Sequence, residues 1–127
     1  MNTIIFEYKY TAILIFKMSQ IEKEIMNEWS TKWFQFILDN PDIPWDWYEL
    51  SKNPSITWDI VQQNPDKKWD WSKLSSNTNI TWDIVQQNQD KPWDWKKLSS
   101  NTMENARKQF ISEKLNAKSN NVSSQHI

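Results

Sequence analysis

The sequence predicts an all-α protein: a solenoid-like array of short capped helices, two in each 24-residue repeat, with a longer capping helix at each end. Three observations support this fold class. A 24-residue block occurs twice in succession and begins a third time. Each half of the block carries the signals of one short helix. Apolar residues at helical spacing flank the blocks on both sides.

Composition limits both the architecture and the function. The chain has 127 residues, enough for one small domain, and it contains ten tryptophans but no cysteine. Disulfides and thiolate metal sites are therefore excluded, and buried aromatic rings must supply the core. The net charge is −1, and residues 45–101 hold eight acidic and seven basic side chains, so we expect nucleic acid to be an unlikely partner.

Residues 1–18 form a leader that does not match the repeat, and the sequence leaves open whether it belongs to the folded protein. Their apolar stretch at 11–16 is too short for a transmembrane helix or a signal peptide, so we expect no membrane partner. Met18 is followed by Ser19-Gln20-Ile21-Glu22, which matches a capping box. This pattern predicts that a helix begins at Ser19, and it suggests Met18 as the initiator methionine.

Residues 19–44 are expected to hold an N-terminal capping helix and a degenerate repeat. Ile21, Ile25 and Trp29 recur at helical spacing. The stretch 33–41 keeps the apolar positions and the Asn-Pro ending of the repeat but lacks its capping residue.

Residues 45–101 contain the tandem repeats. The blocks 45–68 and 69–92 are identical at 17 of 24 positions, and a third copy begins at Trp93. Within each half, an Asp or Thr precedes a Trp, an apolar residue follows three positions later, and an Asn comes another three positions on. The Asp or Thr residues are predicted N-caps at positions 46, 57, 70, 81 and 94. The asparagines at 53, 64, 77, 88 and 101 are predicted to end the helices in a left-handed conformation.

The C-terminal part is predicted to close the array. Met103, Ala106 and Phe110 place apolar side chains on one face of a longer helix over residues 102–115. The polar tail 116–127 is expected to be disordered.

The residues that carry chemistry do not form a catalytic pattern. The repeated carboxylates fall at cap or first-turn positions, where they stabilise a helix start. His126 is the single histidine, so we expect no catalytic residue, no metal site and no cofactor, and we interpret the chain as non-enzymatic.

The tryptophans have two interpretations. Those at 47, 58, 71, 82 and 95 lie three residues before an apolar partner, which favours a place in the core. Trp45, Trp69 and Trp93 precede the caps and are expected to be partly exposed, as a candidate aromatic stripe. Stacking on such a stripe would support the alternative function, a nucleic-acid-associated protein.

A second candidate surface comes from the positions that differ between copies. Three sets of these positions lie on the helix that follows each Trp-Asp-Trp, and they are Tyr48, Glu49, Lys52, Ser72, Lys73, Ser76, Lys96, Lys97 and Ser100. They form a candidate surface for binding another protein. The alternative is that these positions are solvated and simply tolerate substitution.

The blocks WDW-x-x-L-S-x-N and I-T-W-D-I-V-Q-Q-N resemble the Trp-Asp-rich tandem-repeat proteins encoded by giant DNA viruses of amoebae, the mimivirus group. The resemblance covers residues 33–101. It implies a viral gene product of an expanded family, acting in the cytoplasm of an infected host cell. It implies no catalytic or ligand-binding residue.

Overall fold

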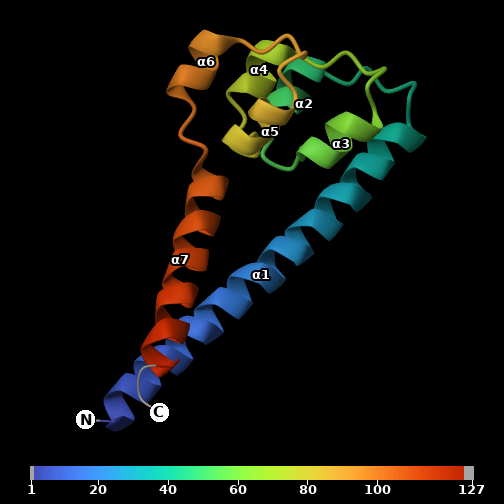
Figure 1. Cartoon of the computed structure of the whole chain (residues 1–127). Helices are drawn as coiled ribbons and strands as arrows, with labels where there is room; N and C mark the ends of the chain where they lie inside the picture. The colour runs from blue at the N-terminus through green and yellow to red at the C-terminus, as the bar shows by residue number, and fades with distance from the viewer. Residues whose placement is uncertain (1, 125–127) are drawn as a thin grey trace. The chain divides into compact units, whose positions relative to one another are not determined.

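The computed structural model describes residues 2–124, and within that range it is helical without any strand (Figure 1). A long helix, five short helices and a second long helix follow one another, as the sequence predicted for the fold class. They are α1 (Asn2–Asp39), α2 (Trp47–Lys52), α3 (Trp58–Gln63), α4 (Trp71–Ser75), α5 (Trp82–Gln87), α6 (Trp95–Ser100) and α7 (Glu104–Ser124).

The first helix is longer than the sequence predicted. α1 runs without a break from Asn2 to Asp39, so the predicted helix start at Ser19 is wrong. The Ser19 hydroxyl donates to the Phe16 carbonyl, 2.8 Å away, as a serine inside a helix does. The capping-box pattern misled because no turn residue precedes it, and the apolar leader continues the same helix.

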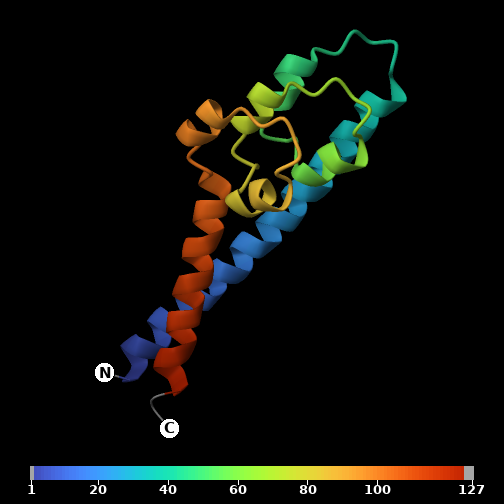
Figure 2. The ribbon, with the colours of Figure 1, turned by 45° about the horizontal axis from the view of Figure 1, so that its top comes forward.

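The chain divides into two compact units. One contains α1 up to Ile25 together with α7 from Arg107 onward, and the other spans Met26–Ala106. In the first unit the two helices approach each other toward the chain ends, as Figures 1 and 2 show, and the Gln20 amide donates to Gln109 Oε1 at 3.1 Å.

The second unit holds the repeats and the core. Every buried apolar side chain of the described residues lies between Phe34 and Leu98. The most deeply buried of them are Ile37, Ile56, Leu74, Ile80 and Val85. All of them belong to one cluster, to which Trp33, Leu38 and Met103 add partly buried contacts.

All five predicted N-caps are confirmed. Asp46, Thr57, Asp70, Thr81 and Asp94 each have extended backbone angles and accept a hydrogen bond from a first-turn amide. Since helices of five or six residues are marginal in isolation, these caps and the packing around them hold the helices in place.

The predicted left-handed ending at the asparagines is wrong. Asn53 and Asn101 have extended angles, Asn64 and Asn88 have φ of −131° and −135°, and α4 is capped by Ser76 instead of Asn77. In the described residues, the one positive φ is 49° at Met103, just before α7 begins. The asparagines serve a different purpose, described below.

The predicted end of the last helix is also wrong. α7 begins at Glu104 and remains helical through Asn116 to Ser124, where a disordered tail was expected. Residues 125–127, which include His126, lie outside the described residues. None of the described helices combines the length and apolar content that crossing a membrane requires.

Candidate binding surface

The helices that follow each Trp-Asp-Trp lie next to one another. α4 packs against α2, and α6 packs against α4. One hydroxyl joins each pair: Ser51 Oγ accepts from the Asp70 amide at 2.8 Å, and Ser75 Oγ accepts from the Asp94 amide at 2.9 Å. Both serines are buried, so these bonds are shielded from water.

The asparagines that follow the Trp-Asp-Trp helices also connect one copy to the next. The Asn77 side-chain amide donates to the carbonyls of Ser51 and Asn53, at 3.0 and 3.1 Å. Asn101 repeats this arrangement one copy later, toward the carbonyls of Ser75 and Asn77. Their side-chain oxygens meanwhile accept from the amide two residues ahead. One asparagine thus closes its own turn and binds the preceding copy.

The proposed aromatic stripe is mostly buried, so the expectation of partial exposure is wrong for two of its three members. Trp69 is 7% exposed and Trp93 is 5% exposed, whereas Trp45 is half-buried. Each indole N–H donates to the carbonyl of the asparagine five residues earlier, at 2.7–2.9 Å. That bond lets the whole ring enter the core without an unpaired donor.

Trp69 and Trp93 each lie between two aromatic rings, one from the copy just before and one from further upstream. Trp69 contacts Phe34 at 5.9 Å and Trp47 at 5.1 Å, measured between ring centroids. Trp93 contacts Trp58 at 5.6 Å and Trp71 at 5.2 Å. Phe34, at the end of α1, therefore takes the place that Trp58 has one copy later.

Two tryptophans of the repeats are exposed, Trp82 at 55% and Trp95 at 56%. Their spacing predicted both in the core, so the expectation is wrong for these two residues. They correspond to Trp58 and Trp71, but no tryptophan inserts between them. The period of 24 residues was the signal that could have found them, since it places the next inserting tryptophan at position 117, which is Ala117.

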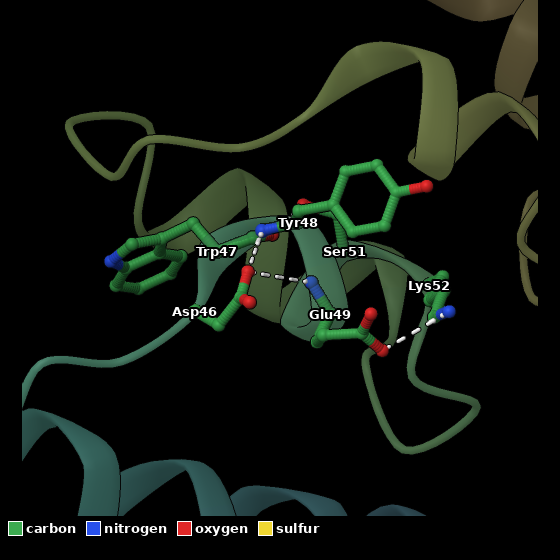
Figure 3. A network of polar contacts seen from close by, with 6 residues as sticks. All are labelled: Asp46, Trp47, Tyr48, Glu49, Ser51 and Lys52. Atoms are coloured by element: carbon green, nitrogen blue, oxygen red, sulfur yellow. Dashed lines mark hydrogen bonds and ion pairs between the residues drawn. The ribbon is translucent and has the colours of Figure 1, made fainter.

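The structure places eight of the nine residues of this candidate surface on the neighbouring helices α2, α4 and α6, and the ninth, Ser76, caps the end of α4. Around α2, the Asp46 carboxylate accepts from the amides of Tyr48 and Glu49, and Glu49 pairs with Lys52 at 3.1 Å (Figure 3). Tyr48, Glu49, Lys52, Ser76, Lys96 and Ser100 are exposed, whereas Ser72, Lys73 and Lys97 are half-buried.

Tyr48 links α2 to α4. The Lys73 ammonium lies 4.5 Å from the centre of the Tyr48 ring, and the Lys52 ammonium lies 5.6 Å from it. Tyr48 raises the pKa of Lys73 above its ordinary value, chiefly by accepting a hydrogen bond, and the carboxylates of Asp70 and Glu49 raise it further. Lys73 is therefore a fixed positive charge at neutral pH.

Ser72 links α4 to α6 by a hydrogen bond to a helix cap. Its hydroxyl donates to Asp94 Oδ2 at 3.1 Å, while the Lys97 amide donates to Asp94 Oδ1 at 3.1 Å. The Lys97 amide, and after it the Ser72 hydroxyl, lower the pKa of Asp94 below its ordinary value of 3.8. The cap of α6 therefore stays ionised at neutral pH.

A hollow of about 410 Å³ lies beside α2. It is lined by Trp45, Asp46, Glu49, Leu50, Lys52, Asn53 and Pro54. α2 is the first of the three neighbouring helices, and the hollow marks its free side.

Within residues 2–124, no three acidic or histidine side chains gather as metal ligands would. The carboxylates at 46, 70 and 94 are engaged as helix caps. Comparison with known protein families, with curated proteins and with solved structures gives no match. The fold and surface define a class: an all-helical protein of tandem Trp-Asp-Trp copies.

Proposed function

We propose that the copies stack as a solenoid-like array and that the exposed face of α2, α4 and α6 binds another protein without catalysing a reaction. One observation carries this proposal: three sets of positions that differ between copies lie on or at the end of three neighbouring helices, while the buried leucines between them stay the same. A fixed framework with a varied face suits recognition.

The charges on this face favour a protein over a nucleic acid. Lys52, Lys73, Lys96 and Lys97 are matched by four carboxylates, Glu49 and the capping residues 46, 70 and 94. A surface that follows a phosphate backbone needs an excess of positive charge instead. Tyr48 adds an exposed aromatic ring, a residue type that is enriched at protein interfaces.

The resemblance to the giant-virus repeat proteins supports a proposal for where in the cell this binding occurs. The chain is proposed to be a viral gene product that acts in the cytoplasm of the infected amoebal cell, with no membrane and no cofactor required.

The test is a binding experiment with matched variants. The full-length chain is immobilised in an extract of infected amoebae, the captured protein is identified, and its affinity is measured with both components purified. Reversing charge at Glu49, Lys73 and Lys97 together should weaken binding by at least about tenfold. The unfolding midpoint should hardly change, because exposed and half-exposed positions contribute within about ±0.5 kcal/mol.

Lys68→Glu is the matched control, since Lys68 is exposed in the connection between α3 and α4 and lies outside the proposed face. Unchanged affinity in the triple variant, measured on folded protein, would refute the assignment of this face.

The exposed rings of Trp82 and Trp95 favour the second candidate function, in which the protein associates with nucleic acid by stacking. Anisotropy of a labelled single-stranded oligonucleotide separates the two functions. Binding that falls steeply as salt rises, and that is lost in Trp82→Ala with Trp95→Ala, would favour the nucleic acid. Absence of binding at low salt would leave the protein partner as the better function.

A further inference from the structure

We propose that the last copy of one molecule docks on the first copy of another, so that two chains associate end to end through the contacts that join neighbouring copies within a chain. The proposal goes beyond the protein partner above and does not depend on it. It rests on what the two ends of the second unit, Met26–Ala106, leave exposed.

Three kinds of contact join each copy to the next within the chain. An inserting tryptophan fills the space between two rings, as Trp93 does between Trp58 and Trp71. The following aspartate donates its amide to a serine hydroxyl. The asparagine that follows the Trp-Asp-Trp helix donates its side-chain amide to two carbonyls. This set of contacts occurs twice in the chain, and the second set is offset from the first by 24 residues.

The end of the array formed by residues 82–101 presents the receiving half of this set. Trp82 and Trp95 are exposed at the places of Trp58 and Trp71. Ser99 is exposed and donates to the Trp95 carbonyl at 2.7 Å, as Ser75 does to Trp71, but no amide of the described residues donates to its hydroxyl. The carbonyls of Ser99 and Asn101 correspond to those that bind the asparagine of the next copy.

The first copy presents the inserting half. Trp45 is only half-buried, although its indole N–H is already bonded as in the later copies. Among the described residues, no acceptor receives the amide of Asp46 or the side-chain amide of Asn53. These are the groups that, at Asp70 and Asn77, bind the preceding copy. The hollow of about 410 Å³ beside them lies on the free side of α2, and α2 itself covers the corresponding side of α4.

The charges of the two ends are complementary. In the chain, Tyr48 meets Lys73 of the following copy, and Ser72 meets the Asp94 carboxylate. Lys96 is the equivalent of Tyr48 and Ser72 in the last copy, Glu49 is the equivalent of Lys73, and Asp46 is the equivalent of Asp94. If two molecules join as neighbouring copies do, Lys96 of one molecule therefore meets Glu49 and Asp46 of the next. Lys96, Glu49 and Asp46 are all exposed in the single chain.

A second copy of this chain is therefore the occupant that the ends specify. The inserting and receiving surfaces differ, so the contact is head to tail and each molecule keeps one free end after pairing. Such contacts generate open chains unless rotation closes them into a ring.

The test is sedimentation velocity of the full-length protein across a wide concentration range at moderate salt. We expect the weight-average sedimentation coefficient to rise with concentration. Lys96→Glu alone, or Glu49→Lys alone, should weaken association by about tenfold, because each brings like charges together. Joining both changes in one chain restores the opposite-charge pair, and association should exceed that of either single variant. Lys68→Glu, with the same change in net charge as Lys96→Glu, should associate like the natural chain.

Trp82→Ala with Trp95→Ala provides an independent arm. Both rings are exposed, so the thermal midpoint should be kept while association is lost. A natural chain that stays monomeric at every concentration would overturn the proposal. Association that persists in the double tryptophan variant, or that the paired charge changes fail to restore, would overturn it equally.

Discussion

At the residue scale, asparagine and serine join the copies by hydrogen bonds while the apolar side chains fill the space between them. Ser51 and Ser75 are fully buried and Asn77 is 4% exposed, and each of these side chains is hydrogen-bonded. In the described residues, no buried side-chain nitrogen or oxygen lacks a partner. The polar contacts thus fix the register of neighbouring copies, since a shift of one residue would break all of them.

A comparison of two asparagines isolates this effect. Asn77→Ala removes the closure of its own turn and two bonds to the preceding copy, whereas Asn53→Ala removes the closure alone. Asn77→Ala should therefore destabilise the protein by about 1–3 kcal/mol more, because two carbonyls lose their donor. Denaturant unfolding of both variants measures the difference, and equal losses would show that the bonds between copies contribute nothing.

The Asp94 carboxylate should contribute to acid sensitivity. Its pKa is lower in the folded chain than its ordinary value of 3.8, so its ionised form favours folding. The contribution is complete above 3.8 and disappears as the pH falls through the lowered folded value. Asp94→Asn removes this titration and keeps a capping oxygen.

The stability difference between the natural chain and Asp94→Asn should therefore shrink in acid. Urea midpoints at neutral pH and at a pH well below 3.8 measure it. A difference that does not vary with pH would contradict the assigned cause of the pKa shift.

At the element scale, local signals predicted where the short helices begin but not how they end. An N-cap bonds to amides two or three residues ahead, so Asp70 or Thr81 can be recognised from its neighbours alone. The side chain of Asn77 instead bonds to carbonyls 24 and 26 residues earlier, which a local pattern does not show. Burial of Trp69 is a similar case, because the rings that cover it are Phe34 and Trp47.

The same reasoning explains the candidate surface. Comparison of the copies was sufficient to find the nine variable positions, because their spacing follows the period. The half-burial of Lys73 could not be predicted from the sequence. The Tyr48 ring lies next to Lys73 only because α4 packs on α2. The exposure of Trp82 and Trp95 follows from the missing tryptophan at position 117.

The first part of α1 should contribute little to the stability of the repeats. The buried apolar residues lie between Phe34 and Leu98, and Leu14, Ile15 and Met18 on α1 are more than half exposed. Deleting residues 1–17 should therefore leave the main thermal unfolding transition unchanged. Circular dichroism follows the transition, and a large fall in the midpoint would show that the first part of α1 supports the core.

At the scale of the whole molecule, the copies contact their neighbours in sequence through one repeated set of groups. α4 lies between α2 and α6, and the bonds from Asp70 to Ser51 recur from Asp94 to Ser75. If the copies stack as a solenoid-like array, stability is the sum of the copies and of the contacts between neighbours. The array should then lengthen without a change in design.

Insertion of one more copy tests whether equivalent copies stack on one another. A duplicate of residues 69–92 is placed after Pro92, which keeps the sequence of every junction between copies. If they stack, we expect the longer chain to fold and its free energy of unfolding to rise. The slope of this energy against urea concentration should increase with the added buried surface. An unchanged or smaller slope, together with a lower midpoint, would mean that the inserted copy stays unfolded, and would contradict the stacking of equivalent copies.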